Sequence, residues 1–467
     1  MNVKKGQELE LAVGDIAFGG RGLARIDGLA VFVDQAVPGD VVRARIFKKK
    51  KNYAEARTLE VISGSPHRVA APCRYSGYCG GCKWQFLDYG QQLVYKRRHV
   101  LESIEHIGLI RNPVVHGTLA SPHVFHYRNK MEFSCSDRRW LLPEEMQAED
   151  VERGIAVGLH VPGTFHKVLD TRECLLQPDL GNLILDRIRQ YIKDSGAPVY
   201  GLKSHQGFWR FVMLRHSRAL DRWLVNLITA AEEQQVVQPL AEALEAEFPQ
   251  IVGVVNNITA RRAGIAVGEI EIPLIGRSVL TDRIGRFSFD ISANSFFQTN
   301  SAGAEMLYRT VRNYAEPRGG ETVVDLYSGT GTIAIWLSDA VGSVIGFEIA
   351  DTAVADADAN CRKNGVDNCR FVAGDLRNSL AVLTRSPHVM VIDPPRTGMH
   401  KDVVQQVLAM APQRIVYVSC NPATLARDLG MMKEQYRIVE VQPVDMFPHT
   451  FHIEAVVKLE RRKGAGQ

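Results

Sequence analysis

Two side chains near the C-terminal end of the chain could together perform covalent chemistry on a pyrimidine ring. Cys420 lies in a Ser-Cys-Asn-Pro run at residues 419–422, and Glu454 ends a Pro-His-Thr-Phe-His-Ile-Glu run. A thiolate that adds to C6 of uracil makes C5 able to accept a methyl group, and a base must then remove the C5 proton. Cys420 is the natural nucleophile and Glu454 the natural base. Many cysteines are buried structural residues, but the polar neighbours of Cys420 at a strand end disfavour that role here.

A proline-rich motif upstream narrows the kind of methyl acceptor. Residues 393–396 read Asp-Pro-Pro-Arg, and motifs of the type Asp-Pro-Pro-aromatic position amino groups for methylation. Arg396 takes the place of the aromatic residue, and a cysteine follows the next predicted strand. This combination argues against methylation of an amine.

A glycine loop ahead of these residues predicts a site for an adenosyl cofactor. Residues 325–332 read Asp-Leu-Tyr-Ser-Gly-Thr-Gly-Thr between a predicted strand and a predicted helix. In a nucleotide-binding sheet such a turn lies at the carboxyl edge, where glycine permits close backbone approach. Glu348 ends the next strand and could accept both ribose hydroxyls, and Asp375 could bind the adenine amine. The sequence has no Gly-Lys-Ser/Thr phosphate loop, so we expect S-adenosylmethionine as the cofactor.

Three of the eight cysteines form a compact, glycine-rich cluster, Cys73, Cys79 and Cys82. Such spacing in a cytosolic protein indicates a metal or cluster site in preference to disulfides. A fourth ligand must come from Cys135 or Cys174. Zinc and a 4Fe–4S cluster both accept four cysteines, and spacing alone leaves both open.

Three regions must position these residues in a multidomain α/β fold. Residues 1–63 hold short alternating segments and Gly/Pro turns, which predict a small OB-like β-barrel. Residues 66–280 hold the cysteines, a helix over about 87–108 and mixed α+β structure. Residues 281–467 alternate strand and helix, which predicts a mainly parallel, doubly wound, Rossmann-like sheet. Its strands are predicted at residues 322–326, 343–347, 369–373, 389–392, 414–418 and 452–459.

The bulk composition sets the class of protein and its surroundings. The chain has 467 residues, 45% hydrophobic and 23% charged, which is ordinary for a globular protein of several domains. No apolar run approaches the ~20 residues that span a bilayer, and no signal-peptide core is visible, so we expect a cytoplasmic monomer. Net charge is only +4, and the basic runs at residues 48–51 and 96–98 could each be RNA contacts or solvated surface.

With these motifs, the chain resembles the bacterial RNA uridine-5-methyltransferases, and more closely the branch that modifies 23S ribosomal RNA. The resemblance covers nearly the whole chain, and residues 419–429 and 448–454 match the nucleophile and base signatures closely. It implies an RNA-binding TRAM domain over residues 1–60, RNA as the partner, no DNA and no membrane, and catalysis by Cys420 and Glu454.

The resemblance also implies the ligand-binding residues. A 4Fe–4S cluster would be held by Cys73, Cys79, Cys82 and Cys174, and Cys135 would be structural. Some family members have asparagine at the position of Thr332. The implied contacts of S-adenosylmethionine are Gln298, Tyr327, Thr332, Glu348, Asp375 and Asp393.

Three other functions are alternatives. A transfer-RNA uridine-5-methyltransferase would use the same chemistry, but transfer-RNA members of the family often lack both the barrel and the cluster. A ribosome-assembly factor with vestigial methyl transfer is disfavoured because the proposed cofactor and catalytic residues are complete. An iron–sulfur radical enzyme is disfavoured because the C-x3-C-x2-C signature is absent from the sequence. We therefore expect methyl transfer to C5 of a uridine in 23S ribosomal RNA, with the base flipped out of its stack.

Overall fold

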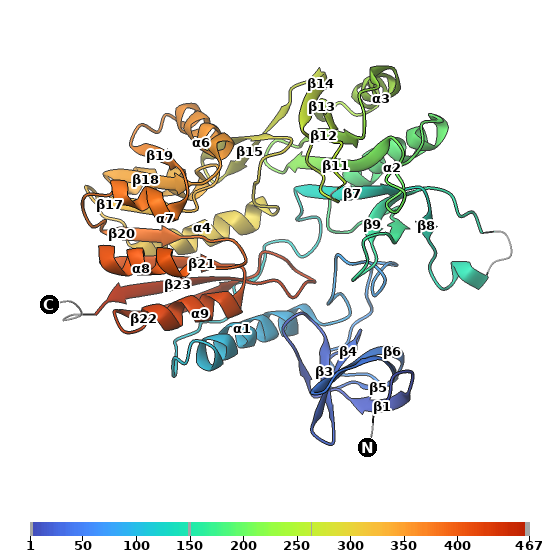
Figure 1. Ribbon diagram of the computed structural model, residues 1–467, viewed down its shortest axis with the longest axis horizontal. Coiled ribbons are helices and arrows are strands. Elements are labelled where there is room, and N and C mark those ends of the chain that lie inside the picture. The colour runs from blue at the N-terminus through green and yellow to red at the C-terminus, as the bar shows by residue number, and fades with distance from the viewer. Residues whose placement is uncertain (1–2, 148–150, 263, 463–467) are drawn as a thin grey trace.

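The computed structural model describes residues 3–147, 151–262 and 264–462. Within these ranges the strands form three larger sheets and one hairpin, which follow one another along the chain (Figure 1). The N-terminal sheet, in blue, lies at the bottom of the view, and the middle sheet, in green, and the C-terminal sheet, in orange to red, lie above it. None of the helices in the described ranges combines the length and the apolar character that crossing a membrane requires.

The N-terminal sheet is an open sheet with the strand order β1-β5-β6-β4-β3-β2. Alternation along its strands buries one face, so that Val31, Val33 and Val42 are fully buried in one cluster. The sequence predicted a closed barrel, but among the described residues no ladder joins the edge strands β1 and β2. β2 is only two residues long and pairs with β3 alone. The strands are β1 (Glu8–Ala12), β2 (Asp15–Ile16), β3 (Gly22–Ile26), β4 (Leu29–Asp34), β5 (Val41–Lys49) and β6 (Tyr53–Ser63).

Helix α1 (Tyr89–His106) follows the cysteine-rich segment and packs against the C-terminal region. Asp88 caps its N-terminus by accepting the N–H of Gln91 at 3.1 Å. Val100 and Ile104 of α1 lie in the same buried cluster as residues of α9 (Pro422–Met432). A segment that follows the cysteine cluster in sequence therefore belongs to the packing of the C-terminal sheet.

The middle sheet is mixed, has the order β14-β13-β12-β11-β7-β9-β10-β8, and has β8 at one edge. Helices α2 (Asp179–Asp194) and α3 (Gln234–Glu247) cover it around a core that contains Trp209 and Trp223. Its strands are β7 (Lys130–Ser136), β8 (Arg139–Trp140), β9 (Ala156–His160), β10 (Val168–Asp170), β11 (Trp209–Ser217), β12 (Arg222–Thr229), β13 (Ile251–Ile258) and β14 (Ile270–Gly276), and the short 3-10 helix η1 (Glu145–Gln147) follows β8.

The hairpin of β15 (Val279–Ile284) and β16 (Phe287–Ser292) leads through a loop to α4 (Ser301–Ala315) and the C-terminal sheet. That sheet has the order β19-β18-β17-β20-β21-β23-β22. Its first five strands in this order are parallel, as predicted, and β23 and β22 are antiparallel. The elements are β17 (Thr322–Leu326), α5 (Thr332–Leu337), η2 (Ser338–Ala340), β18 (Ser343–Glu348), α6 (Asp351–Asn364), β19 (Cys369–Ala373), α7 (Leu376–Ser379), η3 (Leu380–Val382), β20 (Val389–Ile392), α8 (Lys401–Met410), β21 (Arg414–Ser419), β22 (Tyr436–Val444) and β23 (Glu454–Arg461).

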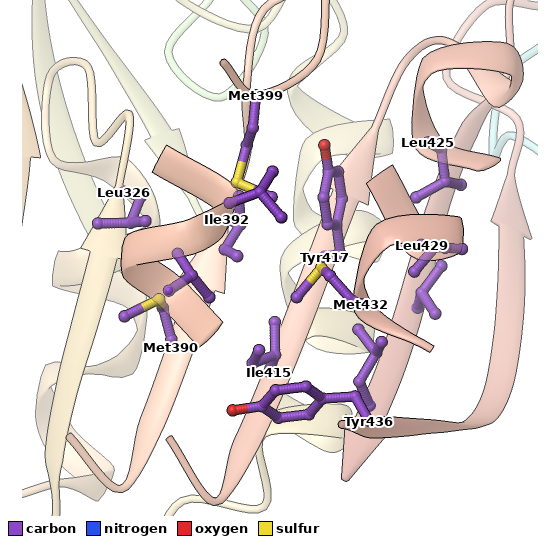
Figure 2. Packing of buried hydrophobic residues seen from close by; sticks show 14 of the residues in the cluster. Leu326, Met390, Ile392, Met399, Ile415, Tyr417, Leu425, Leu429, Met432 and Tyr436 are labelled. Atoms are coloured by element: carbon purple, nitrogen blue, oxygen red, sulfur yellow. The ribbon is translucent and has the colours of Figure 1, made fainter. Parts of the chain in front are cut away.

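Strict alternation along the C-terminal strands gives the sheet two buried faces. Ile415 and Tyr417 of β21 point to the face covered by α1, α8 and α9, whereas Val416 and Val418 point to the face covered by α4 and α5. A fully buried aliphatic side chain contributes about 1.5–3 kcal/mol, so both faces hold the strand ends firmly. Figure 2 shows the first face, where strand residues meet α9 through Leu326, Met390, Ile392, Met399, Ile415, Tyr417, Leu425, Leu429, Met432 and Tyr436.

Candidate active site

The ladder between β21 and β23 places Cys420 opposite Glu454. The two strands are antiparallel, and their register matches Ser419 with Ala455. Continuing this register by one residue matches Cys420 with Glu454, and residues directly opposite in such a pair have Cα atoms about 4.5–5.5 Å apart. The two predicted reaction residues therefore lie side by side at one end of the C-terminal sheet. The sequence had predicted the strand from residue 452, whereas Glu454 is its first residue.

Electrostatics couple these two residues to Asp393, which follows β20. Burial and the charges of Glu454 and Asp393 raise the pKa of the Cys420 thiol to about 11. Burial, and after it the charge of Asp393, raises the pKa of Glu454 well above its ordinary range. Burial raises the pKa of Asp393 to about 6. Three acidic groups in one poorly hydrated site oppose one another's ionisation, so the titrations of Cys420, Glu454 and Asp393 are coupled.

Arg396 is the cation of this site, a role that the sequence did not predict. Its charge lowers the pKa of Cys420 and of Glu454, opposing the effect of burial. Its backbone carbonyl accepts hydrogen bonds from Nδ2 of Asn421 at 3.0 Å and from Oγ1 of Thr424 at 3.2 Å. The Asp-Pro-Pro-Arg motif is thereby tied to the segment that follows Cys420. The sequence signal that could have identified this cation is Arg396 itself, at the position where Asp-Pro-Pro motifs carry an aromatic residue.

Tyr308 and Asp325 are two further buried groups that were not predicted as site residues. The hydroxyl of Tyr308, on α4, lies 2.9 Å from Oγ1 of Thr332. Burial, and then the charges of Asp393, Asp325 and Glu454, raise the pKa of Tyr308. Asp325 is fully buried in β17, and neither of its carboxylate oxygens has a hydrogen-bond partner of normal geometry among the described residues. Burial, with the charge of Asp393 after it, raises the pKa of Asp325 well above its ordinary range.

A cavity of about 620 Å³ brings together three of the predicted cofactor residues, Tyr327, Glu348 and Asp375. Glu348 accepts the backbone N–H of Gly329 at 3.0 Å, which fixes the glycine loop against the end of β18. A methyl group added at Gly329 would meet nothing within 4 Å, so open space lies beside this loop. Asp375 caps α7 and pairs with Arg377, whose hydrogen bonds lower the pKa of Asp375 to about 2.

The other predicted cofactor residues lie outside the lining of this cavity among the described residues. Thr332 begins α5 and is bonded to Tyr308. Gln298 lies between β16 and α4, where its backbone carbonyl accepts a hydrogen bond from Nδ2 of Asn129 at 2.8 Å. Asp393 lies with Cys420 and Glu454 through the electrostatic coupling described above. The structure therefore gathers Tyr327, Glu348 and Asp375 in a cofactor-sized cavity and Asp393 with the reaction residues, whereas Gln298 joins neither group.

The loop that leads into Glu454, residues 445–453, contacts residues from the N-terminal half of the chain. The backbone N–H groups of Lys83 and Trp84 both donate to the carbonyl of His449, at 2.8 and 2.9 Å. The side chain of Gln92 accepts the N–H of His449 at 2.9 Å, and the His449 ring stacks on Phe125. Lys83 directly follows Cys82, so the cysteine-rich segment contacts the loop of the predicted base.

A buried ion pair adds a second anchor for this loop. Nζ of Lys96, on α1, lies 2.6 Å from Oδ1 of Asp445, and both side chains are fully buried. Lys96 also donates to the carbonyl of Phe447 at 3.0 Å, and Tyr89 donates to Oδ2 of Asp445 at 2.9 Å. Removing one partner of such a pair typically costs about 3–5 kcal/mol because the other charge is left buried. The basic run at residues 96–98 is therefore partly structural.

The four cysteines implied as cluster ligands line one cavity of about 250 Å³, and Cys135 does not. Burial raises the pKa of Cys79 and of Cys82 to about 12, and it also raises the pKa of Cys174. Cys135 is fully buried in the core between the middle sheet and its helices. Among the described residues, no three His, Cys, Asp or Glu side chains lie close enough together to hold a single metal ion.

Known proteins resemble this chain over almost its whole length. The model of the tRNA (Uracil-5-)-methyltransferase family matches residues 277–462, and that of the TRAM domain matches residues 2–59. A protein named an uncharacterized RNA methyltransferase from Chlorobaculum tepidum is 42% identical, covering 98% of this chain and 97% of its own. A second of that description, from Bacteroides thetaiotaomicron, is 38% identical, covering 95% and 99%. The chain thus belongs to the S-adenosylmethionine-dependent RNA uracil-5-methyltransferase family.

A solved structure shares the architecture as well. The tRNA (uracil-54, C5)-methyltransferase of Pyrococcus abyssi, in complex with S-adenosyl-L-homocysteine, has 28% sequence identity and a TM-score of 0.76. The match covers 97% of this chain and 100% of the other. The N-terminal TRAM domain and the C-terminal methyltransferase fold are therefore established for this enzyme.

Proposed function

We propose that this enzyme methylates C5 of a specific uridine in 23S ribosomal RNA through a covalent bond between Cys420 and C6 of the base. The observation that carries the proposal is the β21–β23 register, which pairs Ser419 with Ala455, the residues next to Cys420 and Glu454; the charge of Glu454 also acts on the Cys420 thiol. A nucleophile and a base on opposite members of one strand pair can reach neighbouring atoms of a single ring.

The atoms and electrons of the reaction balance as follows. The Cys420 thiol gives its proton to solvent, its sulfur adds to C6, and the electron pair of the 5,6 double bond makes C5 nucleophilic, while Glu454 stays ionised. Bound S-adenosylmethionine would supply the methyl group from its sulfonium and leave as S-adenosylhomocysteine, and the positive charge of the sulfonium would favour ionised carboxylates around it. Glu454 then takes the C5 proton, the double bond re-forms, and the sulfur leaves C6. Arg396 favours the ionised forms of both Cys420 and Glu454.

The residues around the glycine loop fit an adenosyl cofactor. Glu348 and Asp375 line the cavity of about 620 Å³ beside Tyr327. In this proposal Glu348 would bind the ribose hydroxyls and Asp375 the adenine amine. Asp325 offers two buried oxygens without partners among the described residues, which suits a cationic group. Gln298, Thr332 and Asp393 complete the proposed contacts of the cofactor.

The cysteine cavity is the proposed site of a 4Fe–4S cluster held by Cys73, Cys79, Cys82 and Cys174. Tetrahedral zinc, with Zn–S bonds of about 2.3 Å, would bring the sulfurs within about 4 Å of each other. A cluster of several metal atoms separates its thiolates further than a single zinc ion does, and the four thiols share the lining of one cavity. The cluster would stabilise the segment that contacts His449 and would transfer no electrons.

The three-part organisation supports RNA as a large substrate. In this proposal residues 1–63 and 66–280 present the RNA, residues 281–467 perform methyl transfer, and the enzyme acts as a monomer in the cytoplasm. The second candidate substrate is transfer RNA. The Pyrococcus abyssi enzyme acts on tRNA by its name, and its whole length matches this chain, so the TRAM domain does not by itself exclude tRNA.

Trapping the covalent step tests the mechanism and the target together. Cells that express the tagged enzyme are grown with 5-fluorouracil, because fluorine at C5 blocks the final elimination. The enzyme is purified under denaturing conditions, and the attached RNA is sequenced. The wild type is expected to retain 23S fragments, the Cys420→Ala variant none, and the control Cys361→Ala the wild-type amount. If tRNA is attached, the assignment moves to the second candidate. If the wild-type enzyme carries no RNA, the covalent mechanism is excluded.

A further inference from the structure

A basic cavity of about 530 Å³ lies at the β8 edge of the middle sheet and has no part in the proposed reaction. Five of its lining residues are lysine or arginine, and one, Asp137, is acidic. A nucleotide-sized ligand fits a cavity of this volume, because ligand sites typically enclose about 300–1,000 Å³. The sign of the charge favours an anionic ligand.

Three of these cations are available for a ligand. Arg139 pairs with Glu145 at 2.8 Å and supports the chain around β8. Arg138, Arg153 and Lys203 are exposed, and no carboxylate lies within ion-pair distance of them among the described residues. Exposed cations without local partners are what a phosphate backbone neutralises on binding.

The same cavity presents an aromatic surface. Trp140 is 42% exposed, and Nζ of Lys167 lies 3.9 Å from the centre of its ring. Phe165 lies outside the lining, on the turn between β9 and β10, but its ring is 69% exposed and contacts that of the lining residue His166. Large exposed aromatic rings next to cations are typical of sites that bind single-stranded RNA, where bases stack on rings and phosphates contact the cations.

A second cavity lies between the β9–β10 turn, the N-terminal sheet and the cysteine-rich segment. It has a volume of about 730 Å³ and is lined by Pro162 and Gly163 of the same β9–β10 turn. Arg45 and Phe47 of the N-terminal sheet and Lys83 line it as well. The backbone N–H of Lys83 donates to the carbonyl of His449, so this second cavity has basic and aromatic side chains and a lining residue that contacts the loop leading to Glu454.

We propose that the cavity at the β8 edge binds an unpaired nucleotide of the RNA substrate, at a distance along the strand from the reacting uridine. Arg138 and Lys203 contact its phosphates, and Trp140 contacts its base. This inference rests on the proposed function, because it takes RNA as the substrate. It adds a second point of attachment, which would select RNAs that can reach both sites at once.

Photo-cross-linking tests the location directly. Full-length enzyme is irradiated with 23S ribosomal RNA transcribed with 4-thiouridine, and in parallel with tRNA prepared in the same way. Mass spectrometry of the linked peptides is expected to find residues 138–141 or 165–167 among the attachment points. Cross-links that fall only on peptides near Lys83 and Cys420 would overturn the proposal.

Paired variants test the contribution of the cavity to binding. Loss of two phosphate contacts in Arg138→Ala/Lys203→Ala is expected to reduce the slope of log Kd against log salt by about 1.4. The control Arg222→Ala/Arg437→Ala removes the same charge elsewhere on the surface. Trp140→Ala is expected to weaken binding about tenfold, with kcat at saturating RNA unchanged. Equal effects in both double variants would show only a loss of net charge and would overturn the proposal.

One readout separates this inference from the proposed function. A short hairpin RNA with one 5-fluorouridine reports adduct formation at Cys420 and is too small to reach the β8 edge. Variants that lose affinity for long RNA but form this adduct normally support the second site. If the wild type forms no adduct on any RNA, the proposed function fails, and the cross-links still decide whether the cavity binds RNA.

Discussion

Two sets of thiols in this enzyme have pKa values shifted in the same direction, and their surroundings give them different chemistry. Cys420 lies at a strand end beside Glu454, Asp393 and Arg396, with its pKa raised to about 11. Cys79 and Cys82 lie in the cysteine cavity, where burial raises their pKa values to about 12. A high thiol pKa therefore identifies neither a nucleophile nor a ligand by itself.

The difference lies in which groups the sequence brings alongside each thiol. Cys420 has a carboxyl group opposite it and a cation nearby, so a proton can move within the site as the sulfur adds to a base and leaves it. The cavity thiols have one another, and a bound metal centre would remove their protons and use all four sulfurs. The β21–β23 ladder holds the first arrangement, whereas a glycine-rich loop and one cysteine ahead of α2 form the second.

The largest effect on the catalytic side is expected for Glu454→Gln. The amide cannot take the C5 proton, so elimination should slow by about 10²–10⁴-fold while attack by Cys420 continues. Quenched reactions run on denaturing gels should then show an RNA–enzyme adduct with ordinary uridine. The matched control is Glu460→Gln at the other end of β23, which should turn over like the wild type. Turnover by Glu454→Gln near the wild-type rate would exclude Glu454 as the base.

On the cysteine side, Cys79→Ser is expected to remove the metal centre. Serine is a poor ligand for iron, so the iron content and the visible absorption of anaerobically purified enzyme should fall strongly. Cys135→Ser is the control, because Cys135 is a fully buried thiol that lies outside the cavity. It should keep its iron and lose only stability, by about 1–3 kcal/mol. Equal iron content in both variants, or no iron in the wild type, would exclude the proposed cluster.

Between the two regions, His449 should make stability depend on pH. Burial lowers its pKa to about 4, and its Nε2 has no hydrogen-bond partner among the described residues. Between pH 6.5 and 4 the unfolded chain binds the proton and the folded chain does not, so stability falls as the pH falls. The loss attributable to His449 should be about 2 kcal/mol between pH 7.5 and 5.

Denaturant unfolding at the two pH values measures this loss. His449→Gln removes the titrating group while retaining a polar side chain, so its stability should fall less between pH 7.5 and 5 than that of the wild type. An equal fall in both proteins would show that His449 is not the group responsible.

The smallest effect is expected for Arg396→Gln, which sharpens the comparison of the thiols. Arg396 lowers the pKa of Cys420, so its removal should raise that pKa further and reduce the thiolate fraction. Because Arg396 is exposed and screened by solvent, alkylation of Cys420 at pH 9 should slow only about two- to fivefold. Peptide mass spectrometry after iodoacetamide treatment measures the rate, with Arg437→Gln as the control. An unchanged pH profile would show that Arg396 does not act on the thiol.

The sequence by itself determined the C-terminal sheet and the types of chemistry. Its strands are short apolar-rich runs separated by helices, so the buried strands β17 and β20 and the half-exposed edge strand β19 were predicted with their observed bounds. The glycine loop, the cysteine after β21 and the glutamate that begins β23 are signals that local sequence carries without tertiary information. Strand β22 was missed because it lies at the edge of the sheet and carries Glu440 and Pro443 within a half-exposed pattern.

Only the tertiary structure decided which residues meet. The register that matches Cys420 with Glu454, the charge of Arg396 beside them, and the buried carboxylate of Asp325 all depend on strand pairing across the sheet. The contact of Lys83 with His449 and the Lys96–Asp445 pair join segments about 350 residues apart, which no local pattern encodes. Whether the N-terminal sheet closes into a barrel likewise depends on pairing between β1 and β2, which the local sequence does not encode. Local patterns fix elements because they reflect nearby backbone and burial, whereas distant pairings follow from how the elements pack.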